Sequence, residues 1–193
     1  MLKELLEKGY FPSELPAPFT TRDYATAICG PSLPATSPYT YGRKGPKYNS
    51  KCAVFNLARR GKLRRVLLIP NPINYYHCAK SISDNWVDIE AHYKKSDQSL
   101  SRPVADSSRA LSWEKGFAKL SDAKLSTRSA SKYILQADIS NFYPSIYTHS
   151  IPWALHTKPV AKSNFGFHSN IGNQIDAHVR NCQEMQTKGV PIG

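Results

Sequence analysis

The apolar residues of this chain recur with helical spacing in several segments. Residues 1–8 place three leucines on one side and are followed by Gly9, which predicts a short helix that stops there. Elsewhere, apolar residues three or four positions apart, or a local apolar cluster in polar sequence, predict further helices. These helices are expected over residues 73–95, 112–120, 149–162 and 171–186.

Short apolar runs bounded by turn residues predict strands. Residues 52–57 and 65–69 are two such runs, and the sequence Arg60-Gly61-Lys62 between them is typical of a turn. We therefore expect a β-hairpin with a basic tip. A third run over residues 132–138 predicts another strand, so the expected fold class is α/β (α+β).

Prolines are concentrated near the N-terminus, where seven of the 14 lie within residues 10–48. Proline disrupts helix interiors and central strands, so we expect an extended arm. Tyr10, Phe11 and Phe19 are its expected anchors on the rest of the molecule, and a flexible linker is the alternative. The predicted organisation is a helix and arm over 1–48, a middle region over 49–131 and a C-terminal region over 132–193.

The charge of the chain points to a polyanionic partner. Lys and Arg number 26 against 14 Asp and Glu, which leaves a net charge of +12. Such an excess most often marks nucleic-acid binding, although a merely soluble basic surface is the alternative. No apolar run approaches the roughly 18 residues of a membrane helix, and no basic amphipathic helix is present, so a membrane partner is not expected.

The four cysteines are too far apart for a zinc finger, and we expect them to be reduced thiols of a cytosolic protein. They are Cys29, Cys52, Cys78 and Cys182.

Candidate chemistry lies at the end of the predicted 132–138 strand. Asp138 closes this strand and is followed by a turn that contains Phe142 and Tyr143. A strand-end carboxylate suits binding of a divalent cation such as Mg²⁺, which prefers oxygen ligands and shares them with substrate phosphates. An aromatic ring five residues later can lie against a bound sugar. A structural Asp that caps the turn is the alternative interpretation.

Several motifs together resemble one family. The sequence Ala137-Asp138-Ile139-Ser140-Asn141-Phe142-Tyr143-Pro144-Ser145-Ile146 resembles the first palm motif of reverse transcriptases. The following residues 147–156 resemble the bacterial reverse transcriptases of the abortive-infection and defence-associated group. Residues 186–193 resemble the next, glycine-rich motif of that family, and residues 64–72 resemble the fingers hairpin. Residues 9–16 and 99–103 are similar to the same group.

The resemblance implies an RNA-directed DNA polymerase built from fingers (49–131) and the first part of a right-hand palm (132–193). Its cofactor would be Mg²⁺ or Mn²⁺, and its substrates would be dNTPs. DNA and RNA would be its partners, and a non-coding RNA or further copies of the chain are also compatible with the group. It would act in the bacterial cytoplasm in anti-phage defence. Some members of the group resemble polymerases that work without a template from a protein primer, and the residues do not distinguish these modes.

The resemblance also implies a role for each matched position. Asp138 would bind the first catalytic metal, with the Ile139 carbonyl beside it. Tyr143, with Phe142, would face the sugar and reject a 2′-hydroxyl, which disfavours an RNA polymerase of the same palm type. The residues implied in phosphate or template binding are Arg60, Lys62, Arg64 and Arg65. Those implied in the turn against the nucleotide are Gly189, Pro191 and Gly193.

Two departures from the family pattern matter. Ile192 stands where the family usually has Gln, which removes a polar contact to the nucleotide or template. The chain also has no Asp-Asp pair, whereas a two-metal site needs ions about 4 Å apart that are bridged by carboxylates. Because the chain ends on a Gly/Pro turn, we expect a fragment that is inactive by itself. A non-catalytic nucleic-acid-binding module is the alternative function.

Overall fold

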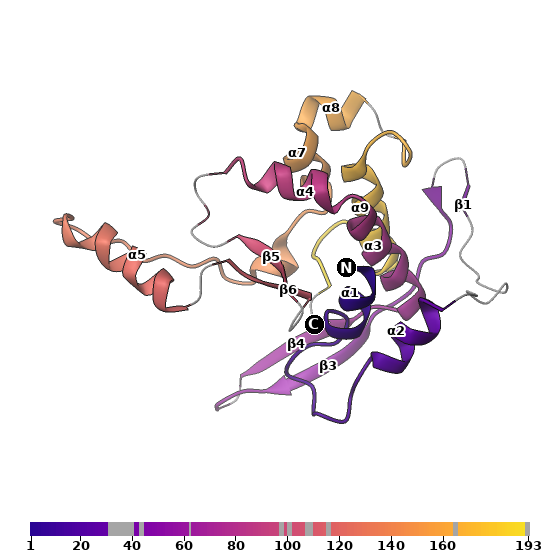
Figure 1. The fold of residues 1–193 in the computed structure, drawn as a ribbon, viewed down its shortest axis with the longest axis horizontal. Coiled ribbons are helices and arrows are strands. Elements are labelled where there is room, and N and C mark those ends of the chain that lie inside the picture. The colour runs from indigo at the N-terminus through magenta and orange to yellow at the C-terminus, as the bar shows by residue number, and fades with distance from the viewer. Residues whose placement is uncertain are drawn as a thin grey trace.

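The computed structural model describes residues 1–30, 41–42, 45–61, 63–96, 99, 102–106, 110–114, 117–163 and 166–191. Its fold is mixed α+β, with short helices and small antiparallel hairpins (Figure 1). No helix in these ranges combines the length and the apolarity that crossing a bilayer requires.

The N-terminal helices form the apolar core with the start of the middle region. Helix α1 (Leu2–Lys8) packs against α2 (Arg22–Ile28) and α3 (Pro72–Asp84), and Leu6 is completely buried among them. Helix α3 begins at this place because the Asn71 side chain accepts a hydrogen bond from the Ile73 amide (3.0 Å), with Pro72 in the first turn. The expected helix over 1–8 is confirmed.

The predicted β-hairpin is confirmed. Strands β3 (Ala53–Ala58) and β4 (Arg64–Ile69) pair antiparallel, from Ala53 opposite Ile69 to Ala58 opposite Arg64. Neighbouring strand residues point to opposite faces, and Leu67 on the inner face is fully buried. At the other end of the hairpin, Gly61 adopts a positive φ of 76°.

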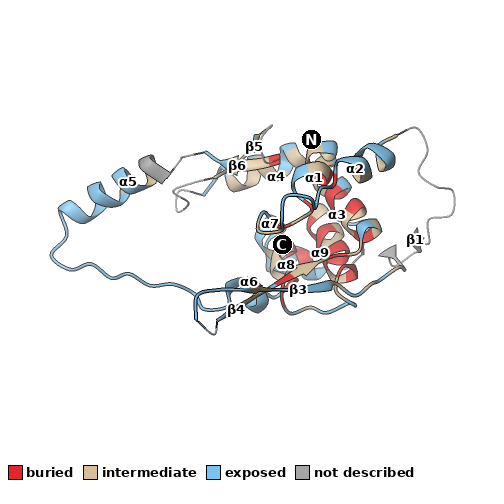
Figure 2. Cartoon of the chain, turned by 90° about the horizontal axis from the view of Figure 1, so that it is seen from below, coloured by how far each residue is buried: buried red, intermediate tan, exposed pale blue. Residues whose placement is uncertain are grey.

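Helix α9 (Ile171–Asn181) is the buried centre of the C-terminal region, and α3 packs on it (Figure 2). Helix α7 (Ser150–His156) also packs on α9, and α8 (Lys158–Ser163) follows α7. The α7–α9 contact is unusually close at Gly172. A Cβ at this position would lie 2.5 Å from the Pro152 Cα, so the contact requires glycine.

Three predicted helices have different bounds from those expected. The 73–95 helix is interrupted at Asn85, which adopts non-helical φ and ψ angles and separates α3 from α4 (Trp86–Tyr93). The 149–162 helix breaks at Thr157, where φ is 71°. The 171–186 helix ends at Asn181, and turns follow it.

The prediction of an extended arm is only partly correct. Residues 22–28 form α2 because this part of the arm is free of proline and can pack Ala25 and Ile28 against the core. Short strands β1 (Tyr41–Gly42) and β2 (Gly45–Pro46) pair further along. Residues 31–40 of the arm lie outside the described residues.

The helix expected over 112–120 is only partly correct. Residues 110–113 form strand β6 (Ala110–Trp113), which pairs with β5 (Pro103–Asp106), and helix α5 (Phe117–Ser129) begins only afterwards. The apolar cluster that indicated a helix is therefore partly a strand, with Ala110 buried in the core.

The strand expected over 132–138 is wrong. These residues pair with no strand in the described part of the chain, and they are exposed, with Leu135 at 92%. A strand needs a hydrogen-bonded neighbour, and none is available to this segment there. Together with α5 the segment projects from the body of the molecule (Figures 1 and 2). The turn expected after it is confirmed as the short helix α6 (Phe142–Ser145).

The Gly172 contact predicts a strong effect of one methyl group. Gly172→Ala would place its Cβ against the backbone of Pro152, so we expect a loss of about 2 kcal/mol in the free energy of unfolding. Urea unfolding monitored by circular dichroism measures this loss. Gly166→Ala is the matched control, because its Cβ would meet no atom closer than 3.8 Å. Equal stability of the two variants would contradict the close α7–α9 contact.

Candidate functional site

Two motifs that are separated in sequence lie against each other. The amides of Gly189 and Val190 donate hydrogen bonds to the carbonyls of Ile146 (2.7 Å) and Tyr143 (3.1 Å), and the Thr148 amide donates to the Thr187 carbonyl (2.8 Å). The glycine-rich turn is thus fixed along the segment that follows Asp138.

Gly189 is required at its position for two reasons. Its φ of 89° lies in the left-handed region, which disfavours side chains, and a Cβ would lie 3.3 Å from the Pro144 carbonyl oxygen. The structure thus explains this glycine by its close approach to the backbone of Pro144 and Ile146, and its implied contact with a nucleotide stays a prediction.

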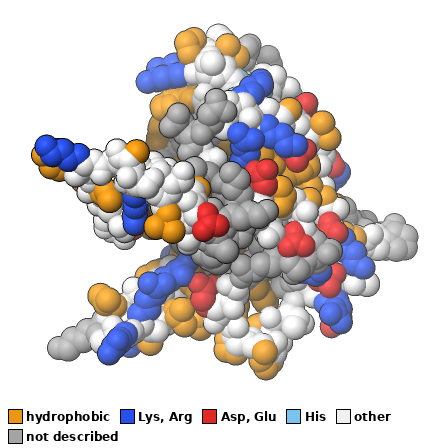
Figure 3. All heavy atoms as spheres, turned by 60° about the vertical axis from the view of Figure 1, so that its left-hand side comes forward, with side chains coloured by type: hydrophobic (Ala, Val, Ile, Leu, Met, Phe, Trp, Pro, Cys, Tyr) orange, Lys and Arg blue, Asp and Glu red, His pale blue; other side chains and the backbone are white. Residues whose placement is uncertain are grey.

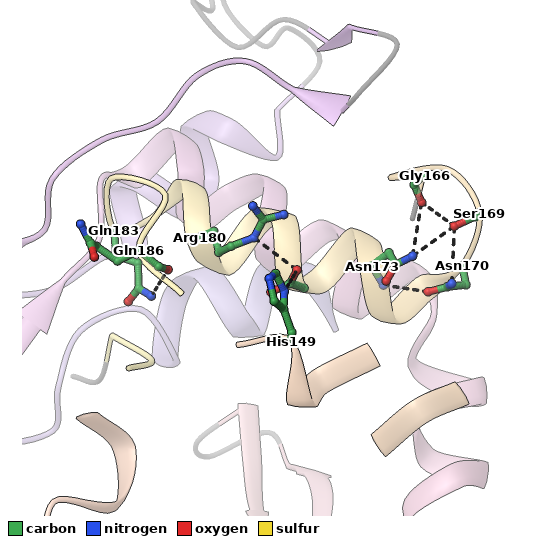
Figure 4. A network of polar contacts seen from close by, with 9 residues as sticks. His149, Gly166, Ser169, Asn170, Asn173, Arg180, Gln183 and Gln186 are labelled. Atoms are coloured by element: carbon green, nitrogen blue, oxygen red, sulfur yellow. Dashed lines mark hydrogen bonds and ion pairs between the residues drawn. The ribbon is translucent and has the colours of Figure 1, made fainter. Parts of the chain in front are cut away.

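Gln183 also holds the glycine-rich turn, and Figure 4 shows its contact with Gln186. Its Nε2 donates hydrogen bonds to the backbone carbonyls of Gln186 (2.7 Å) and Gly189 (2.8 Å). Sequence reasoning missed this residue. Its only signal in the sequence is its position between α9 and the glycine-rich motif. A single glutamine there is not part of any pattern that predicts a contact with the turn.

Three of the predicted site residues line one pocket. Arg65 from β4, Tyr143 from α6 and Pro191 from the end of the described chain surround a pocket of about 260 Å³. These residues come from three motifs that are far apart in sequence, and the fold brings them together. The pocket is completed by residues of the N-terminal arm and of the α3 entrance, namely Gly9, Tyr10, Pro70 and Tyr75.

Tyrosines form a rigid wall of this pocket. The Tyr10 ring stacks on that of Tyr75, with 4.5 Å between centroids, and its hydroxyl donates to the Pro70 carbonyl at 2.6 Å. The Tyr75 hydroxyl donates to the Leu5 carbonyl at 3.0 Å. Burial raises the pKa of Tyr10 to about 12 and raises that of Tyr75 further. Both phenols are therefore neutral donors at physiological pH. Tyr10 is thus an anchor, as predicted for the arm.

The basic residues of the hairpin point in different directions. Arg65 lies on the inner face with Leu67, and its Nη1 is 2.7 Å from Oε1 of Glu14. Arg64 lies on the opposite, exposed face, and Arg60 is exposed beside the tip. Of these three arginines, only Arg65 lines the pocket. Lys62 and Gly193 lie outside the described residues.

Asp138 is exposed and outside this pocket. Its Oδ1 accepts a hydrogen bond from the Ile139 amide at 2.9 Å, and it lines an open groove with Lys124 and Arg128 of α5. Ile139 is exposed as well. Within the described residues, no group of three or more His, Cys, Asp or Glu side chains could hold a metal ion. Asp138 therefore stands here as a single carboxylate near two cations.

Phe142 belongs to the same turn as Tyr143 and contacts it edge to face, with 5.1 Å between ring centroids. Both rings are about half exposed, so the turn presents two aromatic faces to solvent.

Comparison of the sequence with protein-family models and with curated proteins found no match.

The two hydrogen bonds of Gln183 predict a local effect on the glycine-rich turn. Gln183→Ala removes both donors, so we expect the Gly189 and Val190 amides to exchange faster with deuterium, by roughly tenfold for a loss of about 1.4 kcal/mol. Hydrogen-exchange mass spectrometry measures this change. Gln186→Ala is the control, because it keeps the backbone carbonyl that accepts the bond. Unchanged exchange in Gln183→Ala would show that the turn does not depend on this clamp.

Proposed function

We propose that this chain forms the fingers and the first part of the palm of a bacterial cytoplasmic reverse transcriptase of the abortive-infection or defence-associated group. The reaction would be nucleotidyl transfer from a dNTP to a DNA 3′ end or to a priming hydroxyl. One observation carries the proposal: Arg65, Tyr143 and Pro191 were selected on sequence from three separate motifs, and they line the same pocket.

Different residues of the pocket suit different parts of a dNTP. The Arg65 guanidinium has donors beyond the one that contacts Glu14, and its planar fork suits phosphate oxygens. The half-exposed Tyr143 ring can lie against the sugar, where a 2′-hydroxyl would be crowded. The turn at Gly189 fixes the backbone beside Tyr143, so the nucleotide would meet a preorganised surface.

The proposal implies Mg²⁺ or Mn²⁺, and the described residues fit these ions only in part. Asp138 supplies one exposed carboxylate, and a carbonyl such as that of Ile139 is a suitable further ligand for hard cations. A two-metal site needs several carboxylates close together, and the described residues place no such group around Asp138. Asp138 is accordingly proposed as one ligand of a larger site.

Nucleic acid is the proposed partner. Lys and Arg side chains are present on two projections of the molecule, the one that carries α5 and the one formed by β3 and β4 (Figure 3). The exposed Arg60 and Arg64 belong to the second projection. Cations on two projections can contact the phosphates of a strand between them.

A second candidate function is a nucleic-acid-binding module without catalysis. The isolated position of Asp138, beside Lys124 and Arg128, favours it, because these cations suit phosphate contacts even where no metal site forms. The two candidates differ in one property: only the polymerase requires the Arg65–Tyr143 pocket to bind dNTPs.

Adjacent arginines provide a sharp test of the pocket. Arg65→Ala should weaken dNTP binding by about tenfold, because a charge-assisted contact to phosphate is lost. Arg64→Ala removes the same charge from the other face of the same strand and should change the dissociation constant by less than about twofold. Isothermal titration calorimetry with dTTP measures both constants. Equal losses would mean that general charge attracts the nucleotide, and undetectable dTTP binding would favour the binding module.

Asp138 provides the test of the chemistry. In the protein expressed from its complete gene, Asp138→Asn should lower dNTP incorporation by roughly a hundredfold or more, because a metal ligand is lost. Its exposure means that folding should not change. Asp122→Asn on α5 removes the same charge from another exposed position and is the control. Normal incorporation by Asp138→Asn, measured with a radiolabelled dNTP, would contradict the metal role.

A further inference from the structure

A second pocket lies among α7, α8 and α9, and it shares no lining residue with the first. Its volume is about 320 Å³, which is at the lower end of the range for small-molecule sites. Its wall includes Tyr147 and Trp153, and three of its basic side chains are His149, Lys162 and Arg180. Four of its lining residues belong to the 147–156 segment, to which the resemblance assigns no ligand.

A buried carboxylate organises two of these basic side chains (Figure 4). Asp176 is only 4% exposed, and its Oδ2 lies 2.8 Å from Nδ1 of His149 and 3.2 Å from Nε of Arg180. A buried carboxylate is costly unless it is paired, so these contacts fix both partners in place. With Nδ1 of His149 directed at Asp176, Nε2 is the ring nitrogen that remains for a ligand.

The accessible charge of the pocket is positive. The side chains of His149 and Arg180 are 34% and 23% exposed to solvent, and Lys162 is exposed. Asp176 is the only carboxylate among the described lining residues, and its Oδ2 already contacts both His149 and Arg180. Lys158 does not line the pocket, but its Nζ lies 4.7 Å from the centroid of the Trp153 ring. An anion is therefore the favoured ligand, and Arg with Lys and His suits a phosphate.

The aromatic wall adds a second requirement. Tyr147 is 44% exposed although its ring is large and apolar. Its centroid lies 5.6 Å from that of Trp153 and 4.9 Å from that of His149. Exposed rings beside phosphate-binding cations are the arrangement by which proteins bind nucleotides, since every base has a flat face that stacks.

We propose that this pocket binds a nucleotide unit, with its phosphate at His149, Lys162 and Arg180 and its base against Tyr147 and Trp153. The unit is either a free nucleotide or one residue of a single strand, which present the same phosphate and base. This site is separate from the Arg65–Tyr143 pocket and does not depend on the polymerase proposal.

Equilibrium dialysis of the chain against three probes tests the proposal. The probes are dAMP, a six-nucleotide single-stranded oligodeoxyadenylate and inorganic phosphate. Tyr147→Ala and Lys162→Ala alter accessible side chains, so both variants should fold. Each should weaken binding of the nucleotide probe, by about tenfold for Tyr147→Ala, which loses a stacking surface. Circular dichroism of each variant checks the fold.

Two control variants separate this site from other sources of binding. Lys3→Ala removes an exposed lysine on α1, outside both pockets, and should leave the dissociation constant within about twofold of its original value. Tyr143→Ala alters the first pocket, so any binding that this variant weakens takes place there. Sensitivity to Tyr143 and not to Tyr147 would assign the binding to the first pocket and overturn this inference.

The three probes have distinct outcomes. Binding of dAMP that depends on Tyr147 and Lys162 supports a free nucleotide, and such binding of the oligonucleotide alone supports a strand. Phosphate that binds as tightly as dAMP would overturn the proposal, because the aromatic wall would then contribute nothing. If none of the three probes binds, the proposal is overturned as well.

Discussion

The arrangement of the candidate sites depends on one buried polar side chain, that of Asn74. It is completely buried, and its Nδ2 donates to Oγ of Ser50 (2.5 Å) and to the carbonyl of Asn181 (3.0 Å). The Ser50 amide donates to the same Asn181 carbonyl at 2.9 Å. These bonds join the first turn of α3, the end of α9 and the chain that enters β3. A buried amide is costly when unpaired, so this junction strongly favours one relative placement of the three segments.

That placement sets the two walls of the first pocket. The hairpin that carries Arg65 begins just after Ser50, and the Gln183–Gly189 turn beside Tyr143 begins just after Asn181. Helix α9 also carries Asp176 and Arg180 to the second pocket, five residues and one residue before Asn181. A change in the position of α9 would thus disturb both pockets, whereas replacement of an accessible lining side chain would disturb one. This is why variants of accessible lining side chains, such as Tyr147→Ala and Arg65→Ala, are more informative than variants of the buried junction.

Sequence patterns predicted elements whose causes are local. The β3–β4 hairpin follows from two apolar runs around Gly61, and α9 follows from apolar spacing that begins after its Asn170 cap. The breaks at Asn85 and Thr157 were missed because each depends on the backbone angles of a single residue. The site was predicted in part: Arg65, Tyr143 and Pro191 meet in the pocket, yet adjacent Arg64 was not separable from Arg65 without the strand register. Gln183 and Asp176 were missed because their roles arise from tertiary contacts, which a single sequence does not display.

The proposed nucleotide pocket and the proposed metal ligand Asp138 are physically separate in this chain. The Arg65–Tyr143 pocket is built on the hydrogen-bonded Gly189 turn and the Tyr10–Tyr75 stack, so its geometry is fixed without Asp138. Asp138 instead follows an exposed apolar segment in which Tyr133 is 82% and Leu135 is 92% exposed. A strand neighbour would be needed both to cover these side chains and to hold the carboxylate in a defined place. The exposure of this segment and the isolated position of Asp138 therefore have one cause. Nucleotide binding can accordingly be tested on this chain independently of catalysis, and failure of one does not imply failure of the other.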